Sequence, residues 1–120
     1  MSKKGIILVA DDDEALLDTT STLLEFFGYI VIQAKDGFDA ISKYKKYLPE
    51  LVFLDIKMPK MDGYETFFEI EKYFPKAKVI FMTAHADYSE WEKIKNNYAI
   101  ELIEKPYSAE ELKRLVEKFI

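Results

Sequence analysis

The stretch Leu51-Val-Phe-Leu-Asp-Ile-Lys-Met-Pro-Lys-Met-Asp-Gly63 decides the fold and points to the chemistry. Its first four residues are apolar at every position, which is typical of a strand covered on both faces in a parallel sheet. Asp55 follows at once, and a proline-containing loop leads to Asp62-Gly63, a pair that commonly opens a helix. The stretch therefore predicts a buried strand with a carboxylate at its end.

Segments of this kind alternate with helix-length segments along the whole chain. We expect strands over 6–10, 30–34, 51–54, 79–82 and 100–103. Polar residues interrupt the second strand (Gln33) and the fifth (Glu101), which indicates positions near the edges of a sheet. Apolar stripes at helical spacing predict helices over 16–27, 40–48, 64–74, 88–98 and 112–119. Strict alternation predicts a three-layer α/β domain with right-handed crossovers.

The composition limits the class of protein. A chain of 120 residues fits one domain spanning 1–120, and the absence of cysteine excludes disulfides and thiolate metal sites. The 22 acidic against 17 basic residues give a net charge of −5, which argues against direct nucleic-acid binding. No apolar run approaches the ~20 residues that span a membrane. We therefore expect a cytoplasmic protein that contacts neither membrane nor nucleic acid.

The residues after the predicted strands carry reactive groups. Asp11 and Asp12 follow the first strand, Asp55 the third, Thr83 the fourth and Lys105 the fifth. The carboxyl ends of parallel strands share one edge of a sheet, where ligands collect. We therefore expect three carboxylates, a hydroxyl and an ammonium to converge.

Such close carboxylates predict a bound cation. At about 4 Å and an effective dielectric constant near 20, each pair repels by roughly 4 kcal/mol. Oxygen-only donors favour Mg²⁺, with Mn²⁺ as an alternative, over Zn²⁺. The three carboxylates and Lys105 sum to −2, and a divalent cation brings the pocket to 0. The neutral pocket can then accept a phosphoryl group, whose oxygens Lys105 and Thr83 would bind, and a carboxylate can act as the nucleophile.

Each feature also has an ordinary structural interpretation. Acidic residues before a helix commonly cap it, and we assign Asp13 to the cap and Glu14 to the first turn. A strand-end aspartate before a proline loop is commonly part of a turn. His85 is expected to be a loop residue near the mouth of the pocket. The placement of one reactive group at each strand end is what favours a site.

Four motifs together resemble the receiver domain of two-component response regulators. They are Ile-Leu-Val-Ala-Asp-Asp-Asp (7–13), Leu-Asp-Ile-Lys-Met-Pro-Lys-Met-Asp-Gly (54–63), Met-Thr-Ala (82–84) and Glu-Lys-Pro (104–106). The likeness covers essentially the whole chain. It implies a doubly wound, flavodoxin-like sheet of five parallel strands in the order 2-1-3-4-5. It also implies a phosphorylation switch and not an enzyme: the domain would catalyse only its own phosphorylation and its slow autodephosphorylation.

The resemblance implies a role for each metal-binding residue. Asp55 would be the phosphoacceptor and would also bind Mg²⁺. Asp12 would bind the ion directly, and Asp11 directly or through water. The backbone carbonyl of Lys57 would complete the metal shell.

The resemblance also implies how the phosphoryl group is held and supplied. Thr83 would move onto it as the switch, and Lys105 would pair with it. Members often have a cis peptide bond at the position of Lys105–Pro106. The donor would be a histidine kinase or a histidine phosphotransfer protein, and a downstream protein target or a phosphorelay would receive the signal.

Some positions depart from the family pattern. Leu102 stands where an aromatic residue often reports activation, and Tyr107 replaces a usual phenylalanine. Tyr98 stands in place of a usual glycine.

Lys57 and His85 are expected to flank the pocket mouth and to modulate the lifetime of the phosphorylated state. We expect this lifetime to be long enough for phosphate to be relayed.

Three other functions are open to the sequence. An aspartate-nucleophile phosphohydrolase needs a second aspartate two residues after the first, where this chain has Lys57. A flavodoxin needs a Ser/Thr/Gly-rich phosphate loop after its first strand, where this chain has three aspartates. A degenerate receiver that only binds protein would have lost part of the pocket set. The chain is expected to be either a stand-alone receiver or a piece of a longer regulator.

Overall fold

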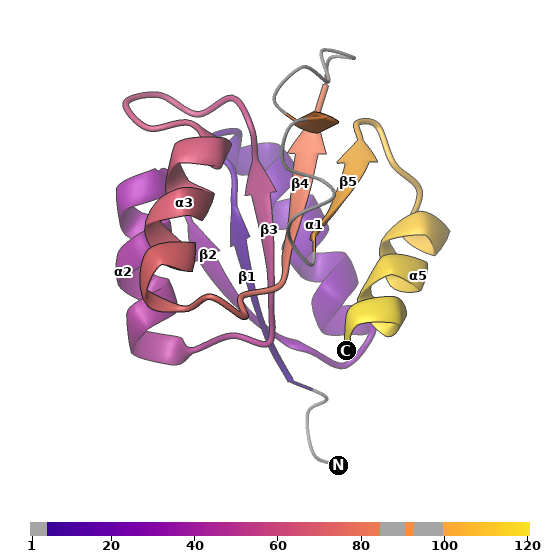
Figure 1. The fold of residues 1–120 in the computed structure, drawn as a ribbon. Helices are drawn as coiled ribbons and strands as arrows, with labels where there is room; N and C mark the ends of the chain where they lie inside the picture. Colours follow the sequence, from indigo (N-terminus) through magenta and orange to yellow (C-terminus); the bar gives the residue numbers. More distant parts are fainter. Residues whose placement is uncertain (1–4, 85–90, 93–99) are drawn as a thin grey trace.

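The computed structural model describes residues 5–84, 91–92 and 100–120. Five parallel strands form a central sheet in the order β2-β1-β3-β4-β5 (Figure 1). The strands are β1 (Ile6–Ala10), β2 (Ile30–Ala34), β3 (Leu51–Asp55), β4 (Val79–Thr83) and β5 (Ile100–Glu104). The predicted strand order is confirmed, and the two strands with polar interruptions, β2 and β5, lie at the edges.

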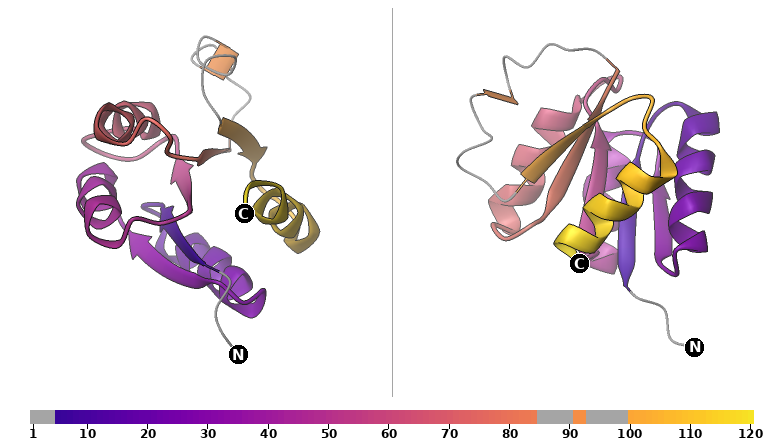
Figure 2. Two further views of the ribbon diagram at one scale, coloured as in Figure 1. Left: turned by 60° about the horizontal axis from the view of Figure 1, so that its bottom comes forward. Right: turned by 90° about the vertical axis from the view of Figure 1, so that its right-hand side faces the viewer.

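Helices cover both faces of this sheet. They are α1 (Glu14–Phe26), α2 (Gly37–Tyr47), α3 (Gly63–Tyr73) and α5 (Ala109–Phe119). Seen along the strands, α2 and α3 lie on one face and α1 and α5 on the other (Figure 2). The three-layer prediction is therefore confirmed. The helix predicted over 88–98 falls largely outside the described residues, of which 91–92 are helical.

Side-chain caps fix where the helices begin. Asp13 caps α1 by accepting the Leu16 N–H at 3.2 Å. Capping boxes open α3, through Asp62 and Glu65, and α5, through Ser108 and Glu111. These helix starts face the carboxyl edge of the sheet, so the caps also fix the loops that surround that edge.

The central strands are buried on both faces, as their continuous apolar sequences predict. Successive side chains point to opposite faces, so Phe81 packs under α2 and α3 while Phe53 packs under α1 and α5. Half-buried Trp91 meets Phe81 edge to face, with ring centroids 6.4 Å apart. Trp91 therefore packs against the core beneath α2 and α3.

Two details of the sequence-based prediction are wrong. Strands β3, β4 and β5 each extend one residue beyond the predicted end, to Asp55, Thr83 and Glu104, because Asp55 pairs with Met82 and Thr83 pairs with Glu104. The apolar stripe of the helix predicted over 64–74 includes Phe68 and leaves out Ile70, yet in α3 Phe68 is 38% exposed and Ile70 is 2% exposed. The buried face of that helix follows the three-residue step from Phe67 to Ile70, which leaves Phe68 beside it.

Candidate functional site

The carboxyl ends of β1, β3, β4 and β5, which lie at the upper edge of the sheet in Figure 1, surround a cavity of about 230 Å³. The cavity is lined by Asp11, Asp12, Asp13, Asp55, Lys57, Thr83, Ala84 and Lys105. The strand order explains this set, because β1, β3 and β4 are neighbours and end together. The structure thus brings together the groups that the sequence places at the strand ends.

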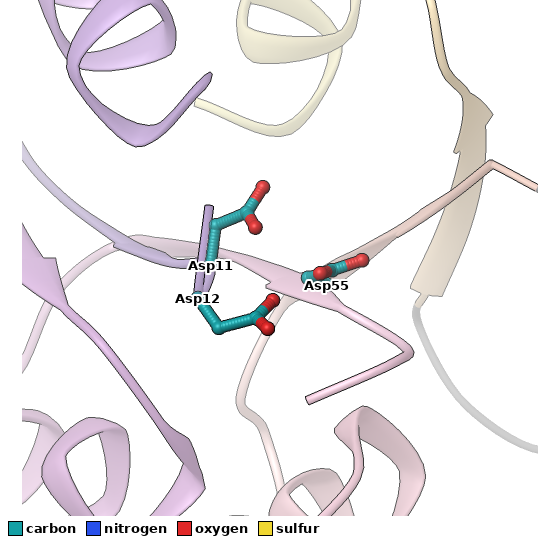
Figure 3. Close-up of side chains that lie close together, drawn as sticks. All are labelled: Asp11, Asp12 and Asp55. Atoms are coloured by element: carbon teal, nitrogen blue, oxygen red, sulfur yellow. The ribbon is translucent and has the colours of Figure 1, made fainter. Parts of the chain in front are cut away.

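Three carboxylates form the acidic part of the cavity (Figure 3). Asp11, Asp12 and Asp55 each offer one oxygen, and these oxygens all lie within 4.8 Å of one another. Asp11 and Asp55 are 1% and 6% exposed, whereas Asp12 is exposed to solvent. An all-oxygen donor set with one open side suits a hard divalent cation that keeps part of its water shell, so these residues fit Mg²⁺.

Lys105 is held between the two buried carboxylates. Its Nζ lies 3.0 Å from Asp11 Oδ2 and 3.2 Å from Asp55 Oδ1, and its side chain is 15% exposed. Its backbone N–H donates to the Thr83 carbonyl at 2.7 Å. The Lys105–Pro106 peptide bond is cis, as the family resemblance implies. The ammonium therefore offsets part of the repulsion between Asp11 and Asp55.

Asp13 has a second role in the site, as a backbone hydrogen-bond donor to Asp11, which the sequence did not predict. Its backbone N–H donates to Asp11 Oδ1 at 3.0 Å, while its carboxylate caps α1. Both oxygens of Asp11 are thereby engaged, one by this N–H and the other by Lys105. The step of two residues from Asp11 to Asp13 is the signal for such a local turn.

The burial of the site changes the proton affinity of two groups. Burial, followed by the negative charge of Asp11, raises the pKa of Asp55 from 3.8 to about 7, against the lowering effect of Lys105. Burial lowers the pKa of Lys105, but the hydrogen bond and charge of Asp11 and the charge of Asp55 outweigh it and leave this pKa raised. At neutral pH the cavity therefore holds a charged ammonium beside a carboxylate that needs further positive charge to stay ionised.

This pKa shift predicts how the stability of the metal-free fold depends on pH. Because the folded-state pKa of Asp55 is raised, its contribution is most favourable below pH 4 and is lost as the pH rises through 7. In EDTA at pH 8, Asp55→Asn should therefore be more stable than wild type by about 1–3 kcal/mol. Thermal melting at pH 8 and pH 5 checks this, since the advantage should shrink at pH 5. An advantage that is larger at pH 5 would contradict the shift.

The predicted modulating residues occupy different places. Lys57 is exposed and lines the cavity. Leu102 is half-buried in β5, pairs in register with Phe81 and packs against the core under α2 and α3. His85 lies outside the described residues.

Comparison with known proteins places the chain in a family. The sequence pattern described as "Response regulator receiver domain" matches residues 7–117. The chain belongs to this family. The receiver is 39% identical over 92% of its length to "Probable transcriptional regulator ycf27" of Porphyridium aerugineum, and covers 45% of that protein. It is 30% identical over 95% of its length to "Sporulation initiation phosphotransferase F" of Bacillus subtilis, and covers 92% of that protein.

Solved structures agree with this assignment. The receiver superposes on the crystal structure of a CheY-like response regulator receiver domain protein from Methanospirillum hungatei with a TM-score of 0.89. The two are 32% identical, and the match covers 98% of this chain and 93% of that one. Proteins of this family act in two-component signalling, where receivers generally bind Mg²⁺ in an acidic pocket and interact with histidine kinases and downstream effectors.

The comparisons also bear on length, location and partners. The receiver spans less than half of the transcriptional regulator that it matches. Because that relative is a transcriptional regulator, the comparisons do not support the prediction of no nucleic-acid contact. Among the described residues, no helix combines the length and apolar character of a membrane span.

Proposed function

We propose that this receiver accepts a phosphoryl group on Asp55 in a Mg²⁺-dependent step, from a phosphohistidine of a histidine kinase or a histidine phosphotransfer protein. The observation that supports it most is the buried Asp55 carboxylate with the Lys105 ammonium at 3.2 Å and two further carboxylates beside it. A nucleophile, a cation for the phosphoryl oxygens and a metal-binding set thus line one cavity.

In the proposed step, a carboxylate oxygen of Asp55 attacks the phosphorus of the donor. An O–P bond forms, the P–N bond to the donor imidazole breaks, and the imidazole keeps the electron pair and takes a proton. The Lys105 ammonium and the Thr83 hydroxyl bind the phosphoryl oxygens through charge-assisted and ordinary hydrogen bonds. Hydrolysis reverses the state: water attacks the phosphorus and releases inorganic phosphate and the Asp55 carboxylate.

Phosphoryl transfer to Asp55 requires additional positive charge in the cavity. Three carboxylates and Lys105 leave the cavity at −2, which repels a phosphoryl donor. When bound by Asp11, Asp12, Asp55 and the Lys57 carbonyl, Mg²⁺ (or Mn²⁺) supplies two charges that neutralise the cavity and favour ionised Asp55. The chain's own residues then supply the nucleophile and orient the transferred group.

We further propose that residues 1–120 form a single cytoplasmic receiver domain that acts as a switch and has no other catalytic turnover. A relative of nearly equal length is a phosphotransferase by name, which supports relay of phosphate. A longer relative is a transcriptional regulator by name, which supports control of an output domain. For either output, Thr83 lies in β4 and Leu102 lies in the neighbouring strand β5 of this receiver. Phosphorylation would act through these two strands to change the surface that a downstream protein binds.

Lys105→Ala tests the division of labour in the cavity. The variant loses the ammonium that contacts Asp11 and Asp55, and with it a charge-assisted bond of about 1.5–3 kcal/mol to the phosphoryl group. Phosphorylation by acetyl phosphate should slow by about 10–150-fold, while Mg²⁺ binding, measured by calorimetry, should stay equal or tighten. Lys76→Ala is the control, since it removes an exposed lysine outside the cavity. Outright loss of Mg²⁺ affinity in Lys105→Ala would contradict the assignment.

Lys57 is expected to protect the phosphorylated state. Its exposed cationic side chain at the cavity rim can lie across the phosphoryl group and obstruct the path of the attacking water. Lys57→Asn should shorten the lifetime of the phosphorylated protein several-fold, and His85→Ala should change it less. Decay of the phosphorylated mass at fixed pH and Mg²⁺ measures this, with exposed Lys60→Asn as the control. Equal decay of wild type and Lys57→Asn would refute the shielding.

A further inference from the structure

A pair of hydroxyl groups joins three segments behind the cavity. The Tyr107 hydroxyl is hydrogen-bonded to the Thr20 hydroxyl in α1. It also donates to Met82 Sδ in β4 at 3.7 Å, which leaves its oxygen to accept from Thr20. Thr20 and Met82 are 1% and 0% exposed, and the tyrosine packs on the core between the sheet and helices α1 and α5. The contact is therefore internal and links α1, β4 and the loop after β5.

Each of these three segments carries a residue of the cavity or directly follows one. Helix α1 starts directly after the acidic run that contains Asp11, β4 ends at Thr83, and the loop after β5 carries Lys105. Lys105 is itself bonded to Asp11. The loop after β5 is thus bonded twice to the segment formed by the end of β1 and helix α1. One contact is the ion pair of Lys105 with Asp11 in the cavity, and the other is the hydrogen bond between the two hydroxyls inside the core.

Packing alone does not require the Tyr107 hydroxyl. A phenylalanine ring would fill the same space without a polar atom. A hydroxyl placed in a core costs free energy unless it is bonded, and this one has partners on two elements. Burial raises its pKa, so the hydroxyl keeps its proton and can donate at neutral pH. The bond therefore adds a fixed point to a loop that packing would otherwise hold by shape alone.

We propose that the hydroxyls of Thr20 and Tyr107 are positioning groups for Lys105, and that they keep its ammonium between Asp11 and Asp55. A lysine head on a flexible four-carbon stem depends on its backbone for placement. The two hydroxyls anchor that backbone two residues away. The consequence for phosphoryl capture rests on the proposed function, whereas the consequence for Lys105 itself does not.

The first measurement uses the metal-free protein and needs no phosphorylation. N-hydroxysuccinimidyl acetate labels lysine amines in EDTA, and peptide mass spectrometry gives the rate at Lys105 relative to exposed Lys57. Tyr107→Phe should raise this ratio about three- to tenfold, the factor that corresponds to one ordinary hydrogen bond. Thr20→Val should give a similar rise, and it tests the same bond from the other side if Tyr107→Phe folds poorly.

Two further variants separate positioning from loss of stability. The double variant Thr20→Val/Tyr107→Phe should show no larger ratio than the larger single variant, because both changes break the same bond. Val116→Ala weakens the packing of α5 in the same core layer without touching either hydroxyl, and should leave the ratio unchanged. An unchanged ratio in both single variants, or an equal rise in Val116→Ala, would overturn the proposal.

The second measurement concerns phosphoryl capture. At saturating Mg²⁺, acetyl phosphate should phosphorylate Tyr107→Phe about three- to tenfold more slowly than wild type, with an unchanged Mg²⁺ dissociation constant. A dissociation constant that changes as much as the rate would mean that the hydroxyls act on the carboxylates, and would overturn the assignment to Lys105. If wild type takes no phosphoryl group at all, the proposed function fails, and the labelling ratio still decides this inference.

Discussion

Asp55→Asn is expected to gain no phosphoryl group under conditions where the wild-type receiver gains one. Asp55 is the carboxylate at the end of β3 that Lys105 contacts, and its amide replacement is too weak a nucleophile to form the O–P bond. The loss should be complete, because both oxygens of Asp11, the other buried carboxylate that contacts Lys105, are already hydrogen-bonded, one by the Asp13 N–H and the other by Lys105. Intact-protein mass after incubation with acetyl phosphate and Mg²⁺ measures it.

A control separates loss of the acceptor from loss of the fold. Asp36→Asn changes another aspartate at a strand–helix junction, where the side chain caps α2 outside the cavity. It should be phosphorylated like wild type. Asp55→Asn should still melt cooperatively, because the substitution removes a buried charge and keeps its shape. A phosphorylated Asp55→Asn protein would contradict the choice of acceptor.

Mg²⁺ should stabilise the receiver strongly. The ion relieves the repulsion among Asp11, Asp12 and Asp55, whose oxygens lie within 4.8 Å of one another. At a hundredfold excess over its dissociation constant, binding contributes about 2.7 kcal/mol. For a domain of this size that is a rise on the order of 10 °C in melting temperature. Scanning calorimetry with and without Mg²⁺ measures the rise.

Asp12→Ala and Asp13→Ala form a matched pair for this effect. Both remove an aspartate that lines the cavity, but Asp12 belongs to the carboxylate cluster and Asp13 caps α1. Asp12→Ala should abolish the Mg²⁺-dependent rise. Asp13→Ala should melt lower in all conditions, by the roughly 1 kcal/mol of a lost cap, and keep the rise. The same rise in Asp12→Ala as in wild type would contradict the metal site.

The sequence predicts most of the fold because local and global signals agree. Continuous apolar runs such as 51–54 favour burial on both faces, which a sheet with helices on both sides provides. Polar residues in β2 and β5 mark the edges, and aspartate and serine caps mark the helix starts. The boundaries at Asp55 and Thr83 are missed because hydrogen bonding along a ladder does not stop where the apolar side chains stop.

The candidate site is predictable in its members but less so in its contacts. Strand order brings Asp11, Asp55 and Lys105 to one edge, so their convergence follows from topology. The bridging position of Lys105 depends on rotamers and on the loop geometry, which carry no periodic signal. The hydroxyl pair of Thr20 and Tyr107 joins residues 87 positions apart, and such a contact is visible only in three dimensions.

Chemical trapping locates the phosphoryl group on the wild-type chain. Borohydride reduces an aspartyl phosphate to homoserine, and peptide mass spectrometry then identifies the altered residue. After incubation with acetyl phosphate and Mg²⁺, we expect conversion at Asp55 and at no other aspartate, with none in EDTA. Conversion at Asp11, Asp12 or Asp13, or a phosphoryl group that borohydride does not remove, would contradict it.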